Sequence, residues 1–127
     1  MPSVLIVEDD RANREAFKRI LKRAGFEVAS VENGLDALDV LSRETYDVIV
    51  CDISMPLLSG IGFFEQLEGV APGMGRRILF VTAYADDKRV REFIDKTGQP
   101  VLEKPVELPA LVEAAQRVAA QKEKEED

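Results

Sequence analysis

The stretch YDVIVCDISMP, residues 46–56, contains the feature that decides the fold. Its apolar run from Val48 to Cys51 is rich in β-branched residues and has no polar alternation, which is typical of a strand covered on both faces in a parallel sheet. The run ends in one carboxylate, Asp52, and then in a turn that contains Pro56. Ligands of open α/β sheets bind at the carboxyl ends of the strands. Asp52 is therefore a candidate for chemistry.

The composition is that of a single globular domain. With 127 residues, 46% of them hydrophobic and 32% charged, the chain is long enough to bury a core without disulfide or metal links. No segment approaches the ~20 apolar residues of a membrane span, and the first residues do not resemble a signal peptide, so we expect a cytoplasmic location without membrane association. The lone Cys51 lies inside the apolar run and is expected to be a core residue.

Charge and residue usage argue against several classes of function. The 24 acidic and 17 basic side chains give a net charge of −7, which disfavours direct nucleic-acid binding through phosphate neutralisation. The chain has no histidine. It therefore lacks the commonest general base and the commonest metal ligand, and it cannot itself be a histidine phosphodonor.

Apolar periodicity outside the central stretch predicts alternating strands and helices. The other expected strands are 3–8, 26–31, 78–81 and 101–103, and the expected helices are 12–24, 35–43, 61–67, 86–96 and 107–121. Gly25 is expected to end the first helix, and residues 53–60 and 70–75 are expected to be loops. Leu35, Leu38 and Leu41 are expected to share one face of the second helix.

This alternation predicts the fold class. Five β-α units with short connections indicate a doubly wound α/β fold, in which helices cover both faces of a parallel sheet. The common order for five strands is 2-1-3-4-5, the flavodoxin-like arrangement, with a crevice between strands one and three. We expect residues 1–121 to form this domain and residues 122–127 to be a charged tail at a solvated helix end.

Polar residues lie at the carboxyl ends of four of the five predicted strands, namely Glu8 with Asp9, Asp52, Thr82 and Lys104. Clustered carboxylates repel one another, and an all-oxygen site of this kind suits Mg²⁺. With such an ion offsetting the charge of an incoming phosphoryl group, Asp52 can act as a nucleophile, while Lys104 supplies a cation and Thr82 a hydroxyl donor. These groups are the ones that formation of an aspartyl phosphate requires.

Four motifs resemble those of response-regulator receiver domains: VLIVEDD (4–10), VIVCDISMPLLSG (48–60), FVTAY (80–84) and VLEKP (101–105). Each is weak alone, but all four in this order form a specific signal. The resemblance covers residues 3–121. It implies a phosphoacceptor module of a two-component system or phosphorelay, which is not an enzyme but assists its own phosphorylation and dephosphorylation.

The resemblance also implies partners and a metal site. Asp52 would accept a phosphoryl group from a phosphohistidine on a sensor histidine kinase or a histidine phosphotransfer protein. Asp9, Asp52 and the backbone carbonyl of Ser54 would bind Mg²⁺, with Glu8 acting mainly through a bound water. The output would pass to a fused or separate effector, and the domain itself would be a monomer or a weak dimer.

The family's remaining site positions are matched by Thr82, which would move toward the phosphoryl oxygens, and by Lys104, which would pair with one of them. The Lys104–Pro105 peptide bond is expected to be cis. Bulky Tyr84, with its neighbour Ala83, would flank the phosphoryl group together with Ser54 and slow its hydrolysis.

One position departs from the family. Receiver domains usually carry an aromatic residue three positions before the lysine, and here that residue is Val101. A valine cannot report phosphorylation by turning an aromatic ring inward. The segment KTGQPVLEKPVEL, residues 96–108, is similar to receiver domains attached to hybrid sensor kinases, many of which relay phosphoryl groups.

Two other functions remain open at this stage. A receiver fold used as a phosphorylation-independent docking module would be favoured by loss of Asp52 or Lys104, and both are present. A phosphatase or phosphotransferase with an aspartate nucleophile would carry a second aspartate where Ser54 stands. Structural alternatives exist as well: the acidic cluster at 8–10 could cap the first helix, and the Gly-Ile-Gly at 60–62 is read as loop flexibility.

Overall fold

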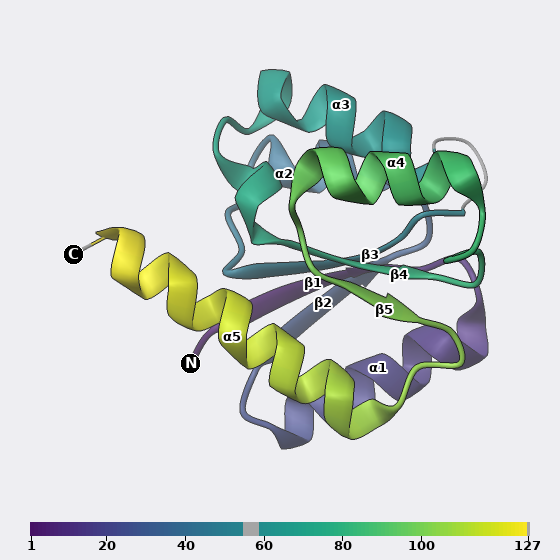
Figure 1. The fold of residues 1–127 in the computed structure, drawn as a ribbon. Coiled ribbons are helices and arrows are strands. Elements are labelled where there is room, and N and C mark those ends of the chain that lie inside the picture. Colours follow the sequence, from purple (N-terminus) through teal and green to yellow (C-terminus); the bar gives the residue numbers. More distant parts are fainter. Residues whose placement is uncertain (55–58, 127) are drawn as a thin grey trace.

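A computed structural model describes residues 1–54 and 59–126, without the side chains of 122–126. Five parallel strands form one sheet in the order β2-β1-β3-β4-β5, which confirms the predicted topology (Figure 1). The strands are β1 (Ser3–Val7), β2 (Glu27–Val31), β3 (Val48–Asp52), β4 (Ile78–Thr82) and β5 (Val101–Glu103). Pro56, the expected breaker after β3, lies outside the described residues.

Helices cover both faces of the sheet, with α2, α3 and α4 on one side and α1 and α5 on the other (Figure 1). They are α1 (Arg11–Arg23), α2 (Gly34–Leu41), α3 (Gly60–Val70), α4 (Lys88–Thr97) and α5 (Leu108–Glu126). Two differences from the sequence prediction follow β3: α3 is longer than expected, and a short 3₁₀ helix, η1 (Met74–Arg77), occupies part of the predicted loop 70–75. Helix α5 continues through the backbone of residues 122–126.

Strand β3 is buried over its whole length, as its unbroken apolar run predicts for a central strand. One hydrophobic cluster lies between the sheet and α2, α3 and α4, and includes Phe63 and Phe80. The second lies between the sheet and α1 and α5, and includes Phe17 and Leu111. Cys51 is fully buried in the first cluster, and burial raises the pKa of its thiol well above its ordinary value. It is a core residue, as expected.

Local features mark the two ends of α1 and the start of α4, which begins two residues later than expected. The Asp10 carboxylate accepts a hydrogen bond from the Asn13 N–H and caps α1. Asp87 caps α4 in the same way. Gly25 follows α1 with a φ of 97°, a left-handed conformation that glycine adopts without steric cost. The caps Asp10 and Asp87 fix where the loops at the carboxyl edge of the sheet end, whereas Gly25 lies in a loop at the opposite edge.

The buried face of α2 differs from the expectation. The residues of this helix that are buried are Gly34, Ala37, Leu38 and Leu41, which follow the i, i+3, i+4, i+7 spacing of one helix face. Leu35 is 49% exposed. At 3.6 residues per turn, Leu35 lies roughly 100° around the helix from Gly34, outside the arc of the four buried residues.

The Gly60→Ala substitution is expected to destabilise the protein by about 1–3 kcal/mol, as overpacking of a filled site does. A Cβ on Gly60 would lie 2.6 Å from the Ile53 Cα and 2.8 Å from the Asp52 carbonyl oxygen, both of them backbone atoms. Urea unfolding measures the loss. The matched control is Gly69→Ala in the same helix, where a Cβ meets nothing within 4 Å. An equal effect of the two substitutions would contradict the packing argument.

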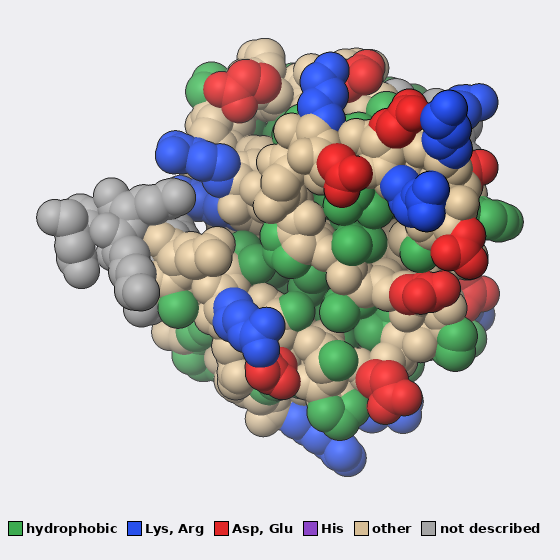
Figure 2. Space-filling model, viewed as in Figure 1, with side chains coloured by type: hydrophobic (Ala, Val, Ile, Leu, Met, Phe, Trp, Pro, Cys, Tyr) green, Lys and Arg blue, Asp and Glu red, His purple; other side chains and the backbone are tan. Residues whose placement is uncertain are grey.

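The surface carries mixed charge. Acidic and basic side chains are interspersed on the face shown in Figure 2, with hydrophobic side chains between them. Within the described ranges, no helix is both long and apolar enough to cross a membrane.

Candidate phosphoacceptor and metal site

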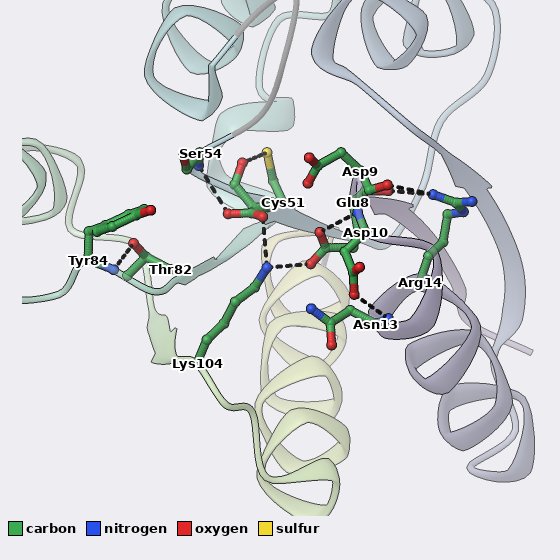
Figure 3. A network of polar contacts seen from close by, with 11 residues as sticks. Glu8, Asp9, Asp10, Asn13, Arg14, Cys51, Ser54, Thr82, Tyr84 and Lys104 are labelled. Atoms are coloured by element: carbon green, nitrogen blue, oxygen red, sulfur yellow. Dashed lines mark hydrogen bonds and ion pairs between the residues drawn. The ribbon is translucent and has the colours of Figure 1, made fainter.

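The carboxyl ends of four strands bring the candidate site residues together (Figure 3). Glu8 and Asp9 directly follow β1, and Asp52 and Thr82 are the last residues of β3 and β4. Lys104 follows β5. The register pairs Val7 with Cys51, Asp52 with Val81 and Thr82 with Glu103, so these strand ends lie side by side.

Lys104 lies between two buried carboxylates. Its Nζ is 2.8 Å from Asp52 Oδ2 and 2.8 Å from Glu8 Oε1. The side chains of Glu8 and Asp52 are 1% and 5% exposed, and that of Lys104 is 17% exposed. One cation therefore holds both acidic groups at the end of the sheet. The Lys104–Pro105 peptide bond is cis, as predicted.

Burial and charge shift the pKa values of this cluster. Desolvation raises the pKa of Glu8 from its ordinary 4.5 to about 7, and the Asp52 charge adds to the rise, while the hydrogen bond from Lys104 opposes it. Burial lowers the pKa of Lys104, but hydrogen bonds and charge from Asp52 and Glu8 outweigh it and raise that pKa overall. The cluster thus keeps its ammonium charged and holds a carboxyl group that can retain a proton near neutral pH.

The acidic side chains fit a divalent cation. One carboxylate oxygen from each of Glu8, Asp9 and Asp52 lies within 4.8 Å of the others. Glu8 Oε1 is buried and, apart from its ion pair with Lys104, accepts no hydrogen bond from the described residues. Asp9 is exposed, which leaves room for water ligands. Oxygen ligands on one side and water on the other are the arrangement that Mg²⁺ prefers.

Two backbone groups orient the site. The Ser54 N–H donates to Asp52 Oδ1 at 3.0 Å, so hydrogen bonds from Ser54 and Lys104 hold the two oxygens of this carboxylate. Thr82 is fully buried, and its Oγ1 accepts a hydrogen bond from the Tyr84 N–H at 2.9 Å. In Figure 3 the Thr82 hydroxyl points toward Tyr84.

The site opens to solvent on two sides. A hollow of about 520 Å³ borders Lys104 and is lined also by α1, Ala83 and Pro105. A second hollow of about 290 Å³ is lined by Ser54 and by Tyr84, which is 58% exposed. Asp52 is buried and is hydrogen-bonded to Lys104 of the first hollow and to Ser54 of the second.

Val101 lies beside an aromatic cluster. It pairs with Phe80 in the register of β4 and β5, and it is half-buried. The Phe80 ring meets Phe93 of α4 at a centroid distance of 5.2 Å, and both rings contact Phe64 of α3. The aromatic contacts next to residue 101 therefore come from β4, α3 and α4.

Sequence reasoning missed one residue near the site, Arg14. Its guanidinium donates hydrogen bonds to the backbone carbonyl oxygens of Glu8 and Asp9 (Figure 3). Arg14 stands four residues after Asp10 in a helix rich in basic residues, and no sequence motif distinguishes it from an arginine that faces solvent.

The pKa of Glu8 predicts how stability depends on pH without metal. Between pH 4.5 and about pH 7, Glu8 keeps its proton in the native state but loses it in the unfolded state. The free energy of unfolding should therefore fall as pH rises through this window, by up to about 3 kcal/mol. Urea unfolding in EDTA measures this slope, and Glu8→Gln should flatten it. An equal slope in Glu8→Gln would assign the effect to other groups.

Comparisons with known proteins agree with this geometry. A family model described as response regulator receiver domain matches residues 4–116. The chain is 36% identical over 109 residues to a cyclic di-GMP phosphodiesterase of Thermotoga maritima, a match that covers 86% of this chain and 28% of that protein. It is 31% identical over 114 residues to the polar-differentiation response regulator DivK of Brucella anthropi, covering 87% of this chain and 90% of that one.

A solved structure shares the fold and contains a metal ion. The receiver domain of the sensor histidine kinase PA1611 from Pseudomonas aeruginosa, with magnesium coordinated in its active-site cleft, superposes with a TM-score of 0.82. The two are 29% identical, and the match covers 94% of this chain and 98% of that one. The chain spans less than a third of the length of the phosphodiesterase relative.

Proposed function

The chain belongs to the response regulator receiver domain family, and on that premise we propose that Asp52 is its phosphoacceptor. Receiver domains are signalling modules of two-component systems. The observation that carries the proposal is the placement of one buried carboxylate at the end of β3, between the Lys104 ammonium and the Ser54 N–H and beside Glu8 and Asp9. Among the described residues, this set combines a nucleophile, a cation and an acidic metal site.

The proposed reaction is a phosphoryl transfer between two proteins. An Asp52 carboxylate oxygen attacks the phosphorus of a phosphohistidine, the O–P bond forms, and the P–N bond breaks as the imidazole leaves with the bonding electron pair. Lys104, which pairs with Asp52 Oδ2 before transfer, would then pair with a phosphoryl oxygen. Thr82 would exchange its contact with the Tyr84 N–H for one with the phosphoryl group.

Glu8, Asp9, Asp52 and the Ser54 carbonyl are the groups proposed to hold Mg²⁺. When bound, the ion supplies positive charge that offsets the negative charge of the phosphoryl oxygens. The acidic cluster supports this assignment, as does the magnesium in the related receiver domain. The pKa of Glu8 near 7 implies that protons and Mg²⁺ compete for this cluster.

The proposed partner is a sensor histidine kinase or a histidine phosphotransfer protein, since receiver domains work with histidine kinases. Relatives of this chain include receiver domains within longer proteins such as the T. maritima phosphodiesterase. We also propose that this chain is cytoplasmic, passes its output to a fused or separate effector, and is a monomer or a weak dimer. The mixed charge in Figure 2 offers no basic patch for nucleic acid on that face.

Incubation with Mg²⁺ and phosphoramidate, a small donor that contains a P–N bond, tests the proposal. Intact-protein mass spectrometry should show one added phosphoryl group, and beryllofluoride with Mg²⁺ should bind and block its addition. The absence of any modification would favour a phosphorylation-independent docking module. Continuous turnover of phosphoesters would favour an enzyme.

Tyr84→Ala is expected to speed the loss of the phosphoryl group severalfold. The exposed Tyr84 side chain lines the same hollow as Ser54, next to Asp52, where a bulky ring hinders the approach of water. Phosphate release from the isolated phosphoprotein measures the rate. Tyr84→Phe keeps the ring and should leave the rate unchanged. An unchanged rate in Tyr84→Ala would remove Tyr84 from this role.

A further inference from the structure

Arg14 donates hydrogen bonds to the backbone of the turn between β1 and α1. Its Nη1 donates to the Glu8 carbonyl oxygen at 2.9 Å and to the Asp9 carbonyl oxygen at 3.3 Å. Its backbone N–H donates to the Asp10 carbonyl oxygen at 2.9 Å. Arg14 thus binds three consecutive carbonyl groups of the segment that carries both acidic side chains.

The Arg14 side chain is largely buried, and Glu32 lies beside its guanidinium. The Arg14 side chain is only 12% exposed, although it lies on a helix whose other basic residues are mostly at the surface. Its Nη2 lies 3.4 Å from Glu32 Oε1, in the loop after β2. Glu32 is 70% exposed, so this ion pair contributes little by itself. The contacts that define Arg14 are those to the two carbonyl groups.

Glu8 and Asp9 differ in what else holds them. The Glu8 N–H donates to the Val31 carbonyl oxygen, and its carboxylate accepts from the Asp10 N–H and pairs with Lys104. For the Asp9 carboxylate, the structure of the described residues gives no hydrogen bond or ion pair. The position of this carboxylate therefore depends on the backbone of the turn, which Arg14 holds.

We propose that Arg14 is a positioning residue for the metal site, holding the backbone of Glu8 and Asp9 so that the Asp9 carboxylate faces Asp52. This inference rests on the proposed Mg²⁺ site and names a residue that acts on it without touching the ion. Groups that orient metal ligands change affinity by roughly 10–100-fold when they are removed. Because Arg14 acts through the backbone, we expect an effect of about tenfold, at the lower end of that range.

A purely electrostatic role predicts a different outcome. The positive charge of Arg14 repels Mg²⁺, so removing the charge alone would strengthen binding. Arg14→Lys keeps the charge but replaces the rigid guanidinium, whose Nη1 reaches the turn while Nη2 faces Glu32, with a flexible ammonium group. Arg14→Gln removes the charge. Positioning predicts that both variants bind Mg²⁺ more weakly. If Arg14 acted through its charge alone, Arg14→Lys would bind Mg²⁺ with the affinity of the wild type, and Arg14→Gln would bind Mg²⁺ more tightly.

Isothermal titration with MgCl₂ alone measures the dissociation constant, and the EPR spectrum of bound Mn²⁺ reports the geometry of the site. Phosphoramidate labelling gives a second comparison: the Mg²⁺ concentration for half-maximal rate should rise about tenfold, while the rate at saturating Mg²⁺ stays within about twofold of the wild type. Arg19→Lys, an exposed arginine of the same helix, is the matched control and should change nothing.

Two outcomes would overturn the inference. The first is an Arg14→Lys variant whose Mg²⁺ dissociation constant lies within about twofold of the wild type. The second comes from NMR of the wild-type protein. The ¹⁵Nη resonances of Arg14 should shift when Mg²⁺ saturates the site, while those of Arg19 should not. Arg14 resonances that do not shift would contradict a link between Arg14 and the metal site. Failure of the wild type to bind Mg²⁺ would instead overturn the proposed function.

Discussion

Asp52→Asn is expected to abolish phosphoryl incorporation completely while leaving the fold intact. Asparagine has nearly the same shape, and its Oδ1 can still accept the hydrogen bond from the Ser54 N–H. It has no carboxylate to attack phosphorus, so the O–P bond cannot form at this position. Intact-protein mass spectrometry after incubation with phosphoramidate and Mg²⁺ measures the loss.

The stability of this variant separates lost chemistry from lost structure. The Asp52 charge contributes to the raised pKa of Glu8, so its removal relieves repulsion while one contact with Lys104 is lost. We expect these effects to offset one another and the free energy of unfolding to change by less than about 1 kcal/mol. Asp39→Asn, an exposed aspartate of α2, is the control and should be labelled normally. Labelling retained in Asp52→Asn would place the phosphoacceptor elsewhere, with Asp9 the next candidate.

The fold was predictable because three of its strands are buried on both faces. Strands β1, β3 and β4 are unbroken apolar runs, and their type can be identified without knowledge of their neighbours. The misplaced features depend on local detail. Leucine spacing alone predicts a shared face for Leu35, Leu38 and Leu41, but Leu35 lies outside the arc of buried residues in α2. Pro72 and Gly73 indicate a loop, and they directly precede the 3₁₀ helix η1.

The site was predictable as a set of residues but not as a set of contacts. Topology brings the ends of the parallel strands to one edge, so Glu8, Asp52 and Lys104 had to lie near one another. The Lys104 ammonium contacts both carboxylates. No sequence motif predicts this contact, because it depends on how the side chains are placed. The role of Arg14 was hidden for another reason: its partners are backbone carbonyl groups, which every residue carries.

The second large effect is expected from Lys104→Met, which should destabilise the metal-free protein by about 3–5 kcal/mol at about pH 8, as removal of one partner from a buried ion pair does. The substitution leaves the Glu8 and Asp52 carboxylates, 1% and 5% exposed, without their shared cation. At about pH 6 the loss should be smaller, because Glu8, whose pKa is already raised to about 7, takes up a proton and removes one of the two charges. Urea unfolding in EDTA at the two pH values measures both effects.

Mg²⁺ should restore much of this stability, and the restoration distinguishes a charge effect from a packing defect. Lys104 and a bound cation compete for the same carboxylates, so Mg²⁺ should stabilise Lys104→Met more than it stabilises the wild type. A packing defect would persist at every Mg²⁺ concentration. Lys88→Met, whose side chain is 85% exposed and pairs with Glu92 at 4.0 Å, is the control and should change the free energy of unfolding by less than about 0.5 kcal/mol. If metal-free Lys104→Met were as stable as this control, the two buried carboxylates would not depend on the ammonium, and Lys104 could not be the cation that organises the site before phosphorylation.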